Sequence, residues 1–368
     1  MTVDDLTLLL TRGVGSRTIV HLLDIFGTAE AIMAASADEL VMRGELRPDV
    51  AQRIASREAS SQAYKEVDYC YRHNIATLAA TDSDYPEYLR EVPDRPHVLF
   101  VQGNVRALSK PMISMVGTRD MSPSGQVACN RLIEGISLSR KDACIVSGLA
   151  YGIDAACHRA ALTYGLSTVA VIASPLPEVT PAPHRALAND IIKHGGAIVS
   201  ELHSQSRQNG SLFIARNRII AGLSLGTVVV ESPASGGSLA TADIADSYGR
   251  MVMAVPGRLT DVSSFGSNNL IRSGKARLVL TASDIIDDMG WSPSVSLPTS
   301  EPKGEEECVQ LTDNERKVYD VISGAVVVSL VELLNQTKLT IGDLSMVIVG
   351  LELKGLVRTL PGQRYEKI

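Results

Sequence analysis

The segment Phe213-Ile-Ala-Arg-Asn-Arg-Ile-Ile-Ala-Gly-Leu-Ser224 is followed at once by Gly226-Thr-Val-Val-Val-Glu231. The first segment places Arg216 and Arg218 on either side of Asn217, and the second is an apolar run typical of a buried strand. Arginine is seldom buried without a partner, and its planar guanidinium matches phosphate oxygens. Two arginines before a buried strand therefore favour an anion site, although a salt-bridged helix start at the surface has the same pattern.

Short apolar runs alternate with helix-like stretches on both sides of this segment. Runs typical of strands cover 112–116, 143–146, 167–173, 197–200, 227–231, 251–255 and 277–280. Helical spacing of apolar residues covers 124–139, 153–164, 184–194, 218–223, 239–248 and 282–289. The alternation predicts βαβ units and a mostly parallel, doubly wound α/β sheet that is buried between helices.

The flanking segments have a different character. The first 75 residues are helical in pattern, with one long helix expected over 51–73, and the Gly13-x-Gly15 turn is typical of a helix-hairpin-helix. A short strand is expected at 76–80, followed by a looped approach that contains Arg95-Pro96. The expected parts are a small helical domain at 1–75, the sheet domain at 76–290, a Ser/Pro/Glu-rich linker at 291–310 and a winged-helix-like domain at 311–368.

Composition narrows the class of protein. The 368 residues are 45% hydrophobic and 21% charged, which is ordinary for a globular protein, and no apolar run approaches the ~20 residues that span a bilayer. The net charge is −6, but residues 111–290 carry +1, so a nucleic-acid site must be a local basic patch. The five cysteines have neither zinc-ligand nor redox spacing. We expect a cytoplasmic protein without a metal or other cofactor.

The carboxyl ends of the predicted strands carry the candidate site, because ligands of open α/β sheets bind there. Gly117, Thr118 and Arg119 follow the first parallel strand, Ser147 and Gly148 follow the second, and the glycine-rich segment 235–238 opens a later helix. Glycines let backbone N–H groups approach an anion, and a helix N-terminus adds a partial positive charge. Several such loops on one edge, with arginines nearby, favour a phosphate-binding site.

Standard catalytic and nucleotide motifs are missing. Neither G-x-G-x-x-G after a strand nor GxxxxGK[ST] occurs, which argues against hydride transfer with NAD and against ATP hydrolysis. Asp154 and His158 lie four residues apart on one helical face, and Ser147 lies near them, so a Ser/His/Asp arrangement stays open as a minor alternative. No nucleophile elbow supports that arrangement.

Six segments, taken in order, resemble the DprA/Smf DNA-processing family. They are Val116-Gly-Thr-Arg119, Ser147-Gly-Leu-Ala-Tyr-Gly-Ile-Asp-Ala-Ala-Cys-His158, Arg216-Asn-Arg-Ile-Ile-Ala-Gly-Leu-Ser224, Gly237-Ser-Leu-Ala-Thr-Ala242, Ala254-Val-Pro-Gly257 and Asn269-Leu-Ile-Arg-Ser-Gly274. The resemblance implies an extended Rossmann domain that binds single-stranded DNA, protects incoming DNA during natural transformation and loads the RecA recombinase. It also implies a homodimer without catalytic activity.

By motif match, the resemblance implies a nucleic-acid-binding set made of Gly117, Thr118, Arg119, Gly148, Phe213, Arg216, Asn217, Arg218, Gly237 and Ser238. Phe213 could stack on a base. The chain departs from the family pattern at two places that bear on the site. The usual Gly-Cys-Gly-Leu-Asp is Ala173-Ser-Pro-Leu-Pro177, and the usual Tyr-Pro-x-x-His is Thr180-Pro-Ala-Pro-His184. One arginine of the usual Phe-Pro-Arg-Arg-Asn-Arg is also lost, since Phe213 is followed by Ile-Ala-Arg-Asn-Arg218.

Two rival functions stay open. A nucleotide N-glycosidase on the same sheet would need a carboxylate at the glycine loops, and Glu201 and Glu231 are the candidates. A protein-binding adaptor would act through the C-terminal unit, which has no net positive charge. Nucleotide turnover would distinguish the first rival, and DNA binding by residues 111–290 would exclude the second.

Overall fold

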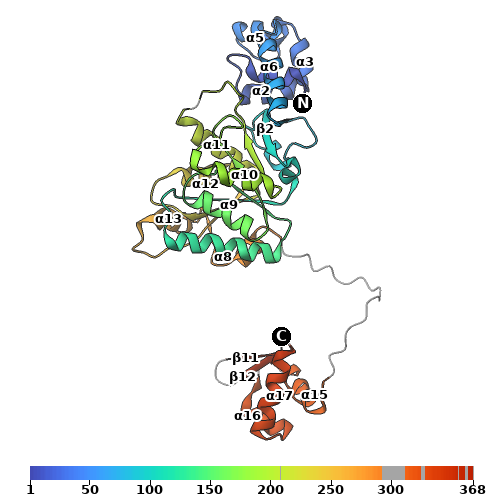
Figure 1. The fold of residues 1–368 in the computed structure, drawn as a ribbon, viewed down its shortest axis with the longest axis vertical. Helices are drawn as coiled ribbons and strands as arrows, with labels where there is room; N and C mark the ends of the chain where they lie inside the picture. Colours follow the sequence, from blue (N-terminus) through green and yellow to red (C-terminus); the bar gives the residue numbers. More distant parts are fainter. Residues whose placement is uncertain (208, 292–310, 325–327, 355, 361–363, 368) are drawn as a thin grey trace, which may run out of the picture. The chain divides into compact units, whose positions relative to one another are not determined.

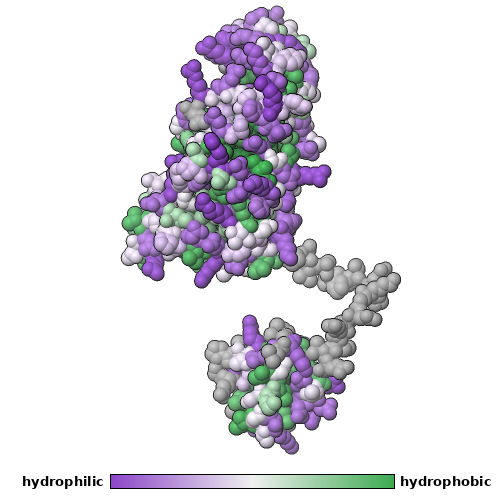
Figure 2. Space-filling view, viewed as in Figure 1, coloured by the Kyte–Doolittle hydropathy of each residue, from purple (hydrophilic) through white to green (hydrophobic). Residues whose placement is uncertain are grey.

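The structure of the chain is a computed structural model. It describes residues 1–207, 209–291, 311–324, 328–354, 356–360 and 364–367 (Figure 1). The chain divides into two compact units, Met1–Ser294 and Val295–Ile368. Hydrophilic side chains cover much of the face of each unit that is visible in Figure 2.

The first unit is built around one sheet, whose strands run in the order β1-β2-β6-β5-β4-β3-β7-β8-β9 in its described part. The strands are β1 (Ala76–Ala79), β2 (Val98–Gly103), β3 (Met112–Gly117), β4 (Cys144–Ser147), β5 (Ser167–Val171), β6 (Ala197–Ser200), β7 (Gly226–Glu231), β8 (Met251–Ala254) and β9 (Arg277–Leu278). Neighbouring strands from β6 to β9 are parallel, whereas β1 and β2 are antiparallel. The predicted doubly wound sheet is confirmed.

Helices cover both faces of this sheet (Figure 1). Helices α8 (Pro123–Ser139), α9 (Ile153–Thr163), α10 (Arg185–Lys193) and α14 (Ala282–Asp288) lie on one face, and α7 (Glu87–Arg90), α11 (Ser211–Gly222), α12 (Gly237–Ser247) and α13 (Phe265–Arg272) lie on the other. Successive strand residues point to opposite faces, so Met112 and Val116 pack toward α11 and α12 while Ile113 and Met115 pack toward α8 and α9. Burying each such side chain stabilises the fold by about 1.5–3 kcal/mol.

The N-terminal helices extend this core. They are α1 (Val3–Leu10), α2 (Ser16–Phe26), α3 (Ala29–Ala34), α4 (Ala37–Met42), α5 (Pro48–Ala55) and α6 (Ser60–Arg72). Leu6 of α1 and Ala63 of α6 belong to the same apolar cluster as Val98 and Phe100 of β2. The helices and the sheet thus share a core, and the boundary between residues 75 and 76 stays a prediction.

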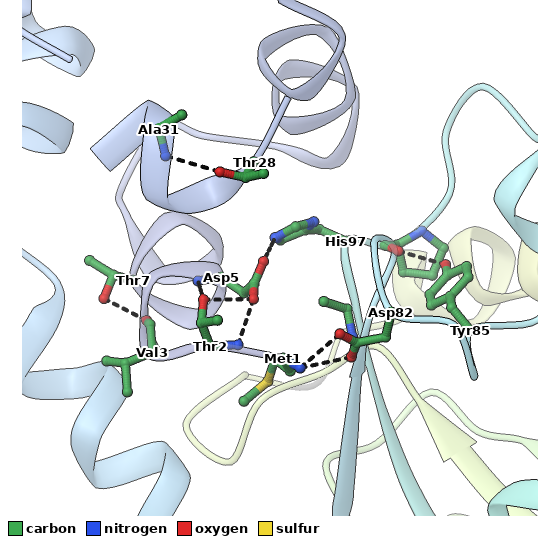
Figure 3. A network of polar contacts seen from close by, with 12 residues as sticks. Met1, Thr2, Val3, Asp5, Thr7, Thr28, Ala31, Asp82, Tyr85 and His97 are labelled. Atoms are coloured by element: carbon green, nitrogen blue, oxygen red, sulfur yellow. Dashed lines mark hydrogen bonds and ion pairs between the residues drawn. The ribbon is translucent and has the colours of Figure 1, made fainter. Parts of the chain in front are cut away.

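Polar contacts reinforce this junction (Figure 3). The Asp5 carboxylate lies 3.0 Å from Nε2 of His97, and the amino group of Met1 donates to the Asp82 carboxylate at 2.8 Å. Although burial acts to raise the pKa of Asp5, hydrogen bonds from His97 and Thr2 hold that pKa below its usual value. The pair therefore anchors α1 to the residue that precedes β2.

Two local expectations for this unit were wrong. The single helix expected over 51–73 is broken between α5 and α6, where Arg57 has a φ of 53° that a continuous helix does not allow. The looped approach that contains Pro96 ends in β2, which was not predicted. Pro96 lies just outside the strand, so it removes no ladder hydrogen bond.

The second unit has the predicted winged-helix fold. Its elements are α15 (Asp313–Ser323), β10 (Val328–Ser329), α16 (Leu330–Thr337), α17 (Ile341–Leu353), β11 (Val357–Leu360) and β12 (Arg364–Lys367). The strands form a sheet in the order β10-β12-β11, of which the short β10 was not predicted. Trp291, the first residue of the predicted linker, is buried against α8 and α14, so it belongs to the first unit. The remainder of that linker, 292–310, lies outside the described residues.

Candidate nucleic-acid interface

A cavity of about 710 Å³ opens at the carboxyl ends of β3 and β7. The chain crosses here from one side of the sheet to the other, because β4 and β7 flank β3. Such a switch point is where open α/β sheets bind ligands. Of the predicted residues, the structure brings together around this cavity Gly117, Thr118, Arg119, Phe213, Arg216, Asn217, Gly237 and Ser238.

Arg216 forms part of the cavity wall although it is only 6% exposed. Its Nη1 donates to the carbonyl oxygens of Gly148, at 2.6 Å, and Val171. Its Nε has no partner among the described residues. Burial lowers the pKa of Arg216 to about 10, an effect that the nearby Asp154 carboxylate opposes. The guanidinium therefore stays charged at neutral pH and keeps one donor for an anion.

Asp154 lies beside Arg216 in the first turn of α9 and is 7% exposed. Burial raises the pKa of Asp154, while the charge of Arg216 acts to lower it. Gly148 separates the two groups, since a Cβ there would lie 2.5 Å from Nη1 of Arg216 and 2.7 Å from Oδ2 of Asp154. A glycine is therefore required where the backbone passes between this carboxylate and this guanidinium.

The outer part of the cavity combines a free charge with an aromatic ring. Arg119 is exposed, and its guanidinium carbon lies 5.8 Å from the centre of the half-buried Phe213 ring. Phe213 thus lines the cavity instead of filling the core. Because the chain provides both a cation and a ring here, a phosphate and a base could be held at adjacent points.

The N-terminus of α12 closes the opposite side. Gly236 is the N-cap and makes no side-chain cap bond. Asn217 donates to the Gly237 carbonyl at 3.2 Å, which ties α11 to α12, and the Ser238 hydroxyl donates to that of Ser232 at 2.9 Å. These polar side chains fix the helix start, and the partial positive charge of the helix faces the cavity.

Arg218 does not line this cavity. Its guanidinium donates to both carboxylate oxygens of Glu201, at 2.8 and 2.6 Å, and to the Asp94 carbonyl. Although burial acts to lower it, the pKa of Arg218 is raised by the hydrogen bonds and charge of Glu201 and by Asp94. The helix was expected to begin at Arg218, but α11 begins at Ser211, so Arg216 and Arg218 lie on opposite sides of one helix.

Gly148 lines a second, smaller cavity of about 130 Å³, which shares Arg119, Phe213 and Arg216 with the first. Tyr151 also lines it and is 47% exposed. Sequence reasoning missed Tyr151 as a site residue. Its place between Ala150 and Gly152, in a loop after a buried strand, was the available signal.

The alternative catalytic groups lie elsewhere. The Ser147 hydroxyl donates to the Met115 carbonyl. The Thr168 hydroxyl donates to the Ile145 carbonyl, so its oxygen accepts a proton from Nδ1 of His158 at 2.6 Å. Burial lowers the pKa of His158 to about 3, and this imidazole does not bond to Ser147. The Ser/His/Asp arrangement is therefore not assembled.

The two candidate glycosidase carboxylates do not line the large cavity either. Glu201 is paired with Arg218. Glu231 lines a different cavity of about 380 Å³ and accepts a hydrogen bond from the Ser122 backbone at 2.9 Å. Among the described residues, no group of His, Cys, Asp and Glu side chains could hold a metal ion. No helix in the described ranges is long and apolar enough to cross a membrane.

Comparisons with known proteins place this geometry in a family. The family model described as DNA recombination-mediator protein A matches residues 76–290, and that of the DprA winged helix domain matches residues 302–363. The putative DNA processing protein DprA of Mycobacterium tuberculosis is 31% identical over 340 residues, which cover 89% of this chain and 86% of that protein. DprA of Streptococcus pneumoniae is 39% identical over 210 residues, which cover 57% of this chain and 73% of that protein.

Two solved structures agree. The X-ray structure of S. pneumoniae DprA has a TM-score of 0.69 at 30% identity and covers 78% of this chain and 98% of its own. The structure of Helicobacter pylori DprA that describes its single-stranded DNA binding mode has a TM-score of 0.52 at 25% identity and covers 59% of this chain and 96% of its own. The chain therefore belongs to the DprA/Smf family of DNA-processing proteins.

Proposed function

We propose that this chain binds single-stranded DNA in the cavity between β3, β7, α11 and α12. The observation that carries the proposal is the convergence there of exposed Arg119, the unpartnered Nε of buried Arg216 and the N-terminus of α12. All three favour an anion. The H. pylori relative, whose structure describes a single-stranded DNA binding mode, supports a DNA strand as the ligand.

In this proposal the strand is held by its backbone. Arg119 contacts a phosphate directly, and Arg216 contributes a buried charge whose position is fixed by the carbonyl groups of Gly148 and Val171. Phe213 offers a face on which a base stacks, and an unpaired strand presents such bases without first opening a duplex. Contacts of this kind give affinity with little dependence on sequence.

We further propose the cellular role that the family implies. The protein would protect incoming single strands during natural transformation and load RecA onto them, as a cytoplasmic homodimer and without catalysis. The family's description as a recombination mediator supports the RecA step. The positions of Glu201 and Glu231 remove support from the glycosidase alternative, because neither carboxylate lines the large cavity.

Arg119→Ala is the decisive test. The side chain is exposed, so its removal should weaken binding of short single strands by about fivefold or more, with an unchanged melting temperature. Arg131→Ala is the matched control, because it removes the same charge from an exposed site on α8, across the sheet. Equal affinity of the two variants and the unmodified protein would place the DNA site elsewhere. Arg216→Ala is less informative, because it also leaves buried carbonyl groups without a donor.

A further inference from the structure

We propose that the 130 Å³ cavity beside the phosphate site accepts one pyrimidine base of the bound strand and excludes purines. This proposal rests on the function proposed above. The large and small cavities share Arg119, Phe213 and Arg216, so a nucleotide whose phosphate lies in the large cavity can place its base in the small one.

The walls of the small cavity suit a flat ring. Tyr151 and Phe213 contribute aromatic groups, and Ala173 and Pro181 contribute small apolar surfaces. The Tyr151 ring is held in position, because it packs edge-on against His184 with 4.9 Å between the ring centres. His184 is itself fixed, since its Nδ1 donates to the Leu149 carbonyl at 2.7 Å. A base would therefore meet a prearranged aromatic wall.

The size of the cavity sets the class of base. A cavity of about 150 Å³ holds one benzene ring, and this one is about 130 Å³. A pyrimidine is a single six-membered ring, whereas a purine is a fused pair of rings that would exceed this space. Thr180 adds a hydroxyl group to the lining, which can donate to or accept from the polar edge of a base.

The lining comes partly from the stretch in which this chain departs from the family pattern. Thr180 stands where the pattern has tyrosine. A phenol ring at this position would occupy space that the threonine side chain leaves open. The base subsite is thus a feature of this chain's own residues, and Thr180→Tyr should fill it without removing a charge from the phosphate site.

The test compares short oligonucleotides of equal length made of thymidine, deoxycytidine or deoxyadenosine. Losing the stacking of one base lowers affinity about fivefold or more, so the unmodified protein should bind both pyrimidine strands at least about fivefold more tightly than the purine strand. Thr180→Tyr and Tyr151→Ala should both reduce this ratio to near one. Tyr71→Ala is the control, because that ring is 84% exposed on α6.

Each outcome separates this proposal from the proposed function. Equal affinity of the unmodified protein for all three strands, or a pyrimidine preference that survives in both variants, would overturn the base subsite while strand binding stands. Failure of the unmodified protein to bind any of the strands would overturn the proposed function together with the subsite.

Discussion

Asp154 opposes the charge that the cavity offers to DNA. Burial raises its pKa above the usual value near 3.8, so the folded state holds this proton more tightly than the unfolded state. Stability from this group is present below pH 3.8 and is lost as the pH rises through the folded pKa. The ionised carboxylate that forms during this rise also repels a bound phosphate.

We therefore expect Asp154→Asn to strengthen binding of single-stranded DNA at neutral pH by roughly fivefold, the effect of about 1 kcal/mol between charges a few ångströms apart. The affinity of the unmodified protein should rise as the pH falls through the pKa of Asp154, and the variant should lack this component. Fluorescence anisotropy at several pH values, with melting curves in parallel, measures both effects. Asp38→Asn, at an exposed site on α4, is the control. Weaker binding by Asp154→Asn would show that the carboxylate supports the site.

At the scale of elements, the position of the site followed from the chain order, because the ends of parallel strands meet at one edge. The separation of Arg218 from Arg216 did not follow from it. That separation depends on where α11 begins, and its N-cap is Gly210, which makes no side-chain cap bond. Without Ser, Thr, Asp or Asn at the helix start, the sequence offers no local signal for the first turn. The partners Glu201 and Asp94 also come from distant segments, so only the folded chain identifies them.

The loop after β4 offers a direct test of the packing between elements. Gly148→Ala would place a methyl group against both Arg216 and Asp154, within distances that side chains cannot tolerate. The variant should melt at a lower temperature, with a loss of about 1–3 kcal/mol typical of overpacking, and should bind DNA more weakly because Arg216 is displaced. Gly210→Ala is the control, because a Cβ there meets nothing within 4 Å. Unchanged stability of Gly148→Ala would show that α9 or α11 can shift without cost.

At the scale of the whole molecule, the winged helix is a poor candidate for the main DNA contact. Its longest helix, α17, contains neither Lys nor Arg, and Ile341, Met346 and Val349 on it are more than half exposed. A helix that reads DNA needs basic or polar groups facing the groove.

A protein that ends at Trp291 should therefore keep the single-strand affinity of the full chain. Filter binding of the two proteins with the same oligonucleotides measures this, and Trp291 must be retained because it packs against α8 and α14. A truncated protein that keeps its melting transition but loses DNA would show that the C-terminal unit makes the main contact.

The dependence of binding on salt should be shallow at each site. Only Arg119 and Arg216 bring cationic side chains to the large cavity, because Arg218 is neutralised by Glu201. For single strands the slope of log affinity against log salt is about −0.7 per phosphate contacted, so two contacts give about −1.4. Titration of a short thymidine oligomer at several salt concentrations measures this slope. In the proposed homodimer a long oligomer would reach two sites, which should steepen the slope and raise the apparent affinity through effective concentration. A steep slope for the short oligomer would mean that cationic groups outside this cavity carry the binding.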